Sequence, residues 1–282
     1  MARIRTHKTN FTAGEISEQM LGRSDLRAYA NGASLLRNVF VHPTGGVTRR
    51  PGLMYLDTLP GKTRLIVFEF NTEQIYLLAF SDLEMHIYRD GVYLTTVVTP
   101  WGMAQLDQIN WVQSADTLLV MHPDVAPKKI TRTSDTDWTL VDWAFVADET
   151  SGRIFQPTHK FASDDVTLTP SGTSGAITIT ASADVFEVEH VGTRFRLIDK
   201  EVEITGVTSA TVAQATTKET LSNSSATKDW EEQALSDVHG WPVSACFHQD
   251  RLVVGGGRDL PNRLWMSKSA DLFNFDLGDG LD

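Results

Sequence analysis

The chain has 282 residues, of which 41% are hydrophobic and 22% are charged. This composition is typical of globular proteins and excludes intrinsic disorder over most of the length. The chain is long enough for two domains, or for one domain with an insertion. The net charge of −11 is unevenly distributed along the chain. Residues 1–64 hold ten Lys and Arg against four acids, which gives +6, whereas the remaining residues hold 15 against 32, which gives −17. So acidic a remainder argues against a protein that wraps nucleic acid, because it would repel the phosphates. The single cysteine, Cys246, excludes an internal disulfide and indicates synthesis in a reducing compartment. The sequence has no apolar run of about 18 residues and no apolar stretch after the basic Met1–Arg5. We therefore expect neither a membrane anchor nor a signal peptide.

Residues 1–62 are predicted to form an arm, a helix and a hairpin. Residues 10–17 are expected to be extended. A helix is predicted from about Ser24 to Asn38, because Ser24 can cap it and apolar side chains recur on one face at Leu26, Tyr29, Ala33 and Leu36. In residues 39–52, Gly45-Gly46 lies between two β-rich runs, which predicts a β-hairpin.

Residues 63–156 repeat one pattern of short strands separated by polar turns. Apolar strands are predicted at 64–70 with 74–80 and at 106–112 with 116–122, and each pair is followed by two shorter strands, at 85–88 and 93–98 and at 129–131 and 138–143. A propeller blade is a unit of four short antiparallel strands, and the 42 residues from Gln74 to Asp116 match the period of propeller repeats. A further, apparently incomplete blade is predicted in 236–282, with strands at 241–247, 250–256 and 263–266.

Residues 157–235 interrupt this pattern. They are dense in Ser and Thr, and alternation at 177–180 and 202–205 predicts a small antiparallel barrel or sandwich inserted between blades. The predicted fold class is therefore mainly β, with incomplete β-propeller-like blades, an N-terminal helical arm and an inserted small β-barrel or sandwich domain. Because closure takes at least about four blades, we expect further blades beyond Asp282 or neighbouring chains that cover the open edges.

Two parts of the sequence resemble a known protein family. The first is Thr-Asn-Phe-Thr-Ala-Gly-Glu-Ile-Ser at residues 9–17, which continues at 23–29, at Arg37-Asn38 and at 45–57. The second is residues 240–254, which continues at 264–267 and at Asn274-Phe275. In this order the segments resemble tail tubular protein B and related tail stabilisation proteins of short-tailed phages.

The resemblance implies a propeller-bearing nozzle at the tip of a short tail. Such a subunit is expected to assemble as a ring, as a homohexamer, below the portal and the head-to-tail adaptor protein, and to let DNA pass out of the capsid. The expected location is the virion tail after synthesis in the host cytoplasm, with other tail proteins such as fibres as further partners. Similar proteins run longer, so we expect a short member or a fragment.

Four arginines are the predicted docking residues: Arg23 and Arg27 on the predicted helix, and Arg49 and Arg50 at the end of the hairpin. Adjacent guanidinium groups can make bidentate contacts with carboxylates, which suits an acidic adaptor surface. The alternative is that they pair with acids of the same subunit, such as Glu15 or Asp57, or are merely solvated.

No catalytic, cofactor-binding or metal-binding residues are predicted, and the chain is not expected to be an enzyme. The sequence has no phosphate-binding Gly-x-x-x-x-Gly-Lys-Ser/Thr loop, and its eight histidines form no His-Glu-x-x-His motif. The carboxylate pairs Glu187/Glu189 and Glu201/Glu203 are expected on the solvent face of strands. Cys246 is expected to be a small core residue, and the tryptophans at 101, 111, 138, 143, 241 and 265 are expected to pack between blades.

Two other functions stay open. Residues 157–235 could form a host-surface carbohydrate-binding or glycan-degrading module, and a glycosidase would need one carboxylate of a pair in an apolar pocket with a raised pKa. The third option is a propeller that binds a peptide, although no sequence motif indicates a peptide-binding groove.

Overall fold

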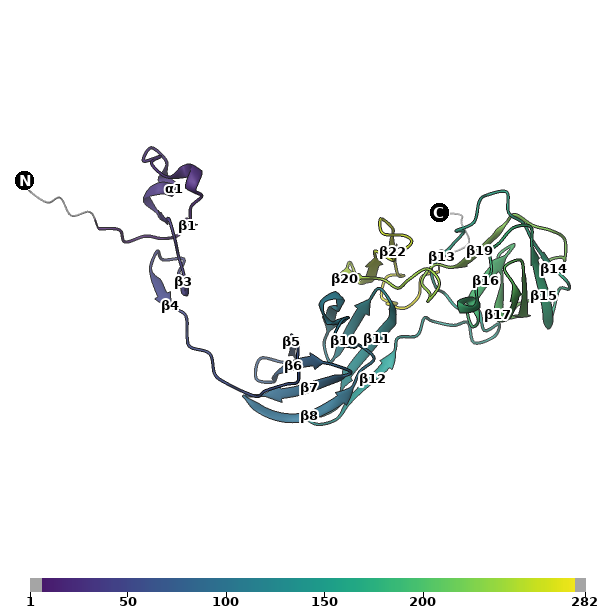
Figure 1. Cartoon of the computed structure of the whole chain (residues 1–282), viewed down its shortest axis with the longest axis horizontal. Coiled ribbons are helices and arrows are strands. Elements are labelled where there is room, and N and C mark those ends of the chain that lie inside the picture. The colour runs from purple at the N-terminus through teal and green to yellow at the C-terminus, as the bar shows by residue number, and fades with distance from the viewer. Residues whose placement is uncertain (1–6, 277–282) are drawn as a thin grey trace, which may run out of the picture. The chain divides into compact units, whose positions relative to one another are not determined.

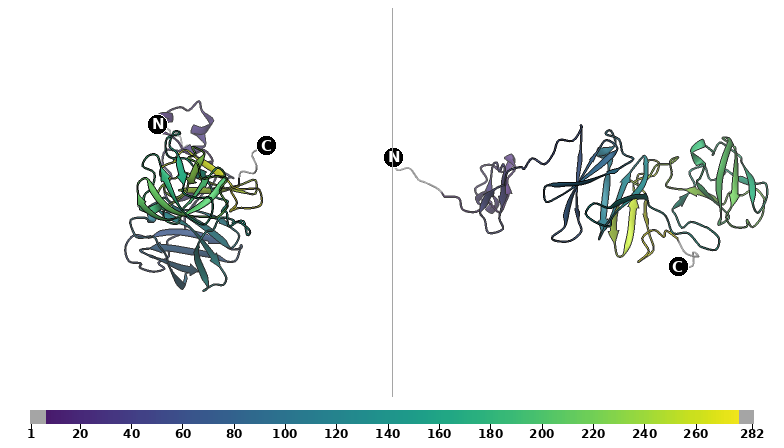
Figure 2. Two further views of the ribbon diagram at one scale, coloured as in Figure 1. Left: turned by 90° about the vertical axis from the view of Figure 1, so that its right-hand side faces the viewer. Right: turned by 90° about the horizontal axis from the view of Figure 1, so that it is seen from below.

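The protein is mainly β, as the sequence predicts (Figure 1; Figure 2). In the part of the chain that the structure describes, the strands form six separate sheets. The computed structural model describes residues 7–276, and the chain divides into two compact units, 1–57 and 58–282. Within the described residues, no helix is long and apolar enough to cross a membrane.

The N-terminal unit contains short elements only. A two-stranded parallel sheet pairs β1 (Gly14–Glu15) with β2 (Gly32–Ala33), and between them lie the 3-10 helix η1 (Glu18–Met20) and the helix α1 (Arg27–Ala30). The predicted hairpin is confirmed: β3 (Val39–Val41) pairs antiparallel with β4 (Val47–Arg49), and Gly45 in its turn has a φ of 102°.

The predicted helical arm from Ser24 to Asn38 is wrong, because the helix is only four residues long. It ends where Gly32 enters the β1–β2 pair, and a Cβ at Gly32 would lie 2.5 Å from Ile16 Cγ2. An amphipathic stripe stabilises a helix only when another element packs against it. Residues 7–57 offer no such element, and backbone pairing of Gly32 and Ala33 with β1 takes the place of the predicted last turns.

Three antiparallel sheets follow, each with its strands in sequence order. The first contains β5 (Arg64–Glu69), β6 (Ile75–Ser81), β7 (Glu84–Arg89) and β8 (Val92–Val98). After the 3-10 helix η2 (Leu106–Gln108), the second contains β9 (Asn110–Ser114), β10 (Thr117–His122), β11 (Val125–Arg132) and β12 (Trp138–Asp142). The third contains β20 (Ser244–His248), β21 (Arg251–Gly255) and β22 (Leu264–Met266).

The second sheet is buried on both faces, and β10 shows this most clearly. Leu118 and Val120 pack into a core that the first sheet also lines, with Phe68 and Leu78. Leu119, from the opposite face of β10, packs into a separate core with residues of β21 and the C-terminal segment, including Leu252, Val254 and Phe275. The three sheets are therefore held together by two apolar layers.

Residues 157–235 form a seven-stranded sheet with its own core around Trp230 and Phe195. The strand order is β13-β19-β16-β17-β18-β15-β14. The bounds are β13 (Thr158–His159), β14 (Leu168–Pro170), β15 (Ala176–Ala181), η3 (Val188–His190), β16 (Arg194–Leu197), β17 (Lys200–Ser209), β18 (Val212–Thr217) and β19 (Trp230–Gln233).

This inserted sheet has two ends, so the closed barrel that was one of the two predicted architectures does not form among the described residues. One end is β14, which has only three residues and stops at Pro170. Proline has no backbone N–H to donate to a further strand, which limits pairing there.

Candidate functional site

The four predicted docking arginines all lie exposed in the N-terminal unit. Arg49 and Arg50 line a pocket of about 670 Å³ together with Arg37, and its other walls are Asn38, Val39, Pro51 and Gly52. Sequence reasoning missed Arg37. The hairpin register was the available signal, because pairing of Val39 with Arg49 brings the residues just before β3 beside those just after β4.

Arg23 and Arg27 do not line this pocket. The Nε and Nη2 atoms of Arg23 bind the two carboxylate oxygens of Asp25 at 2.8 and 2.7 Å, so its fork is occupied within the subunit. Glu15, one of the predicted alternative partners, instead accepts the backbone N–H of Leu36 at 3.1 Å. Among residues 7–276, no ion pair is formed by Arg27, Arg37 or Arg49.

The described part of the N-terminal unit has no hydrophobic core of its own. Between residues 7 and 57 only Gly32 and Gly45 are buried. The largest exposed fractions belong to consecutive apolar side chains after the hairpin, 88% for Leu53, 72% for Met54 and 75% for Tyr55. Neighbouring apolar side chains that are exposed in this way are typical of interaction surfaces.

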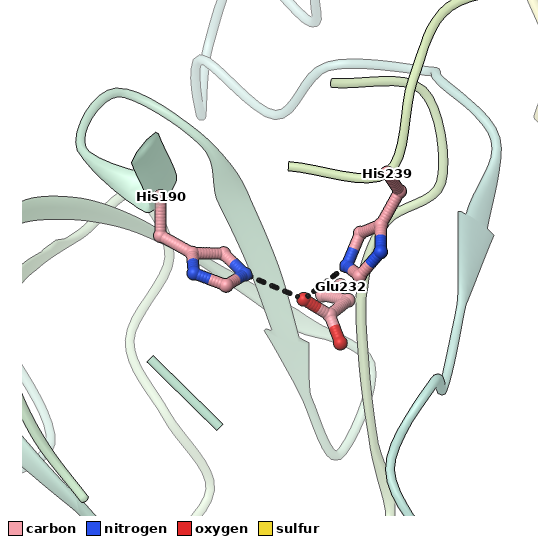
Figure 3. A group of neighbouring side chains, drawn as sticks. All are labelled: His190, Glu232 and His239. Carbon is pink, nitrogen blue, oxygen red and sulfur yellow. Dashed lines mark hydrogen bonds and ion pairs between the residues drawn. The ribbon is translucent and has the colours of Figure 1, made fainter. Parts of the chain in front are cut away.

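In the second unit, three polar side chains meet where the inserted sheet leads into the third sheet (Figure 3). One oxygen of Glu232, in β19, lies 2.9 Å from His190 Nε2 and 3.1 Å from His239 Nε2. The other ring nitrogen of His239 lies 3.0 Å from a carboxylate oxygen of Asp259, which follows β21. Phe161 stacks on the His239 ring with a centroid distance of 3.5 Å.

The partners of the ring nitrogens determine where the protons lie. His190 Nδ1 accepts the backbone N–H of Glu187 at 2.9 Å, so His190 Nε2 carries the proton that it donates to Glu232. His239 lies between two carboxylates, which favours the imidazolium with both nitrogens protonated.

Burial and hydrogen bonding act against each other in this cluster. Burial lowers the pKa of His239, but its hydrogen bonds to Glu232 and Asp259 outweigh this effect, and the pKa is raised. Burial likewise raises the pKa of Glu232, but its hydrogen bonds to His190 and His239 leave that pKa lowered. Both shifts favour a buried carboxylate beside a charged imidazole.

His190, Glu232 and His239 also have the composition of a metal site, since one ligand atom from each lies within 4.8 Å of the others. The hydrogen bond from Glu187 argues against this function. A metal on His190 Nε2 would move the ring proton to Nδ1, where it would face the N–H of Glu187. The geometry therefore favours an electrostatic link between the inserted sheet and the loop after β21.

The predicted solvent-facing carboxylates divide into two groups. Glu187 and Glu189 are exposed, but they lie at η3 and not on a strand. Glu201 is buried, with 1% of its surface exposed, which contradicts the prediction. The segment before the insert covers it, and the N–H of Ile154 donates to its carboxylate at 2.7 Å. Burial raises the pKa of Glu201, but this covering segment also separates the carboxylate from any substrate in solution.

Cys246 is exposed, and its predicted place in the core is wrong. In β20, Ala245 and Phe247 pack against the core, so the alternation along the strand turns Cys246 to the opposite face. Among the tryptophans, Trp138 of β12 does pack between two sheets. Trp138 packs edge-on against Phe68 of the first sheet, with ring centroids 5.0 Å apart.

A scan against protein-family models gives no match for this sequence, and a comparison with curated proteins finds none that is significantly similar.

Proposed function

We propose that this chain is a structural subunit of a short phage tail and forms part of the nozzle through which DNA leaves the capsid. The observation that carries the proposal is the N-terminal unit, where residues 7–57 bury no hydrophobic side chain. So short a segment without a core does not hold one conformation alone. A neighbouring subunit or the head-to-tail adaptor supplies the missing apolar contacts.

The chemistry of this unit favours an acidic partner. Arg37, Arg49 and Arg50 share one pocket, and Arg37 and Arg49 form no ion pair among the described residues. Guanidinium groups grouped in this way bind carboxylates through paired N–H donors. The exposed side chains of Leu53 and Met54 add the apolar contact area that an interface needs.

The stacked sheets of the second unit serve, in this proposal, as propeller-like blades of the nozzle wall. The first sheet leaves Leu65 and Val67 of β5 exposed by 59% and 52%, and the third leaves Leu264 of β22 exposed by 66%. The inner faces of the same sheets are apolar and covered. A further blade or a neighbouring subunit would cover the outer faces and continue a ring, expected to be a hexamer.

The acidic body suits a conduit. Beyond residue 64 the sequence holds 32 acids against 15 basic residues. Carboxylates that line a channel repel phosphates, so DNA passes without being held.

The test is the assembly state of the full chain, alone and with the adaptor, measured by native mass spectrometry. We expect rings for the wild type, and weaker assembly for Leu53→Ser with Met54→Ser and for Arg49→Glu with Arg50→Glu. Val188→Ser is the matched control, because Val188 is 69% exposed in the other unit. A monomer at every concentration, with no ring when the adaptor is added, would contradict the proposal.

A further inference from the structure

A pocket of about 420 Å³ lies between the edge of the inserted sheet and β22. The inserted sheet contributes His159 from β13, Arg196 from β16 and Glu231 from β19. The other wall contains Arg263 and Trp265. This volume falls within the range of about 300–1,000 Å³ that small-molecule sites occupy.

Two guanidinium groups in this pocket have no carboxylate partner. Among residues 7–276, the side chains of Arg196 and Arg263 form neither an ion pair nor a hydrogen bond, although most other arginines of the second unit are paired. Arg196 is partly buried, and burial followed by the nearby charge of Arg153 lowers its pKa, although the charges of Glu201, Asp199 and Glu231 act in the opposite direction without forming an ion pair with it. Burying a cation without a partner is unfavourable, so an anionic ligand would stabilise this arrangement.

The pocket has a net charge of about one positive unit at neutral pH. Burial, and then the charge of Arg263, lowers the pKa of His159, so its ring is neutral. Glu231 accepts a hydrogen bond from Thr158 Oγ1 at 2.5 Å and contributes one negative charge against two arginines. A monoanion therefore matches the pocket better than a dianion such as a phosphate monoester, which Glu231 would repel.

The uncharged lining suits a sugar ring. Leu264, Trp265 and Met266 of β22 provide an aromatic and apolar wall, while Gln156 and Thr158 lie with Glu231 on the polar side. An aromatic side chain packs against the C–H face of a pyranose, and amide and carboxylate groups bind its hydroxyls.

We propose that this pocket binds a carboxylated sugar unit of the uronic acid type, with its carboxylate on Arg196 and Arg263 and its ring against Trp265. The site is independent of the proposed role in a tail, because none of its residues belongs to the N-terminal unit.

The test is titration calorimetry of the full chain with methyl glucuronide, and with methyl glucoside and inorganic phosphate as comparison ligands. We expect the glucuronide to bind and the glucoside to bind about 10- to 100-fold more weakly, since it lacks the hydrogen bonds to charged groups. Arg196→Gln and Arg263→Gln should each weaken glucuronide binding by a similar factor. Lys228→Gln, at an exposed site of the inserted domain outside the pocket, should leave it unchanged.

Arg263 is exposed, so Arg263→Gln keeps the test decisive if Arg196→Gln impairs folding, which thermal melting would reveal. Three results would overturn the inference: no binding of the glucuronide, equal binding of the glucoside or phosphate, or wild-type affinity in Arg263→Gln.

Discussion

His239 links two parts of the second unit through a single ring. Its Nε2 contacts Glu232 of the inserted sheet, and its Nδ1 contacts Asp259 after β21. Its pKa is raised in the folded chain, so the stability that it contributes is fully present below the unfolded pKa of about 6.5 and is lost as the pH rises through the folded pKa. Glu232 behaves in the opposite sense, because its lowered pKa contributes stability that is lost only in acid.

We expect His239→Gln to lower the free energy of unfolding by about 1.5–3 kcal/mol at pH 6, the usual contribution of hydrogen bonds to charged groups. The difference from wild type should shrink as the pH rises through the raised pKa of His239, because the wild-type imidazole then loses its proton. Urea unfolding at pH 6, 7.5 and 9 measures this. His248→Gln is the control, since His248 is exposed on β20. If the difference in stability between wild type and His239→Gln stays constant with pH, the His239 ring is not charged in the folded protein.

The residues of this cluster could not be recognised from the sequence. His190 and Glu232 are 42 positions apart and belong to no motif with ligand spacing. The hairpin that carries Arg49 could be predicted, because its turn chemistry is local, but the docking role of Arg49 and Arg50 stays a prediction.

Strand β10 has a run of apolar residues that do not alternate with polar ones. Its residues from Leu118 to Met121 are all buried, because sheets lie against both of its faces. The sequence predicted a strand at 116–122, and β10 at Thr117–His122 confirms it. The run of apolar residues did not reveal that two different cores share the strand.

Leu118→Ala should destabilise the protein by about 2–5 kcal/mol, since it removes a fully buried side chain from a packed core. The same change at Leu65, which is 59% exposed on β5, should cost less than about 1 kcal/mol. Chemical denaturation of the two variants gives the comparison. Equal losses would mean that the first sheet does not pack on the second as described.

Across the whole molecule, the two units differ in how they are stabilised. Among residues 7–276, the second unit holds three buried apolar clusters, whereas the first unit buries no apolar side chain. Stability of the isolated chain is therefore expected to come from the second unit, where the buried clusters lie.

Removal of residues 1–57 should leave the thermal unfolding midpoint of the remaining chain within about 2 °C of wild type, because no buried apolar contact is lost. If the proposed ring exists, the truncated chain should fail to join it. Calorimetry and native mass measure the two effects separately. A large fall in the midpoint would place part of the folding core in the N-terminal unit.

Local sequence pattern was sufficient to predict the mainly β class, the positions of most strands and the hairpin at 39–52, because side-chain alternation and turn residues act over a few positions. Tertiary structure alone decided that the N-terminal helix is short, that Glu201 is buried and that Cys246 is exposed. Each of these outcomes depends on which distant segment covers a given face. Local pattern carries no information about that, because the free energy comes from contacts between residues far apart in the chain.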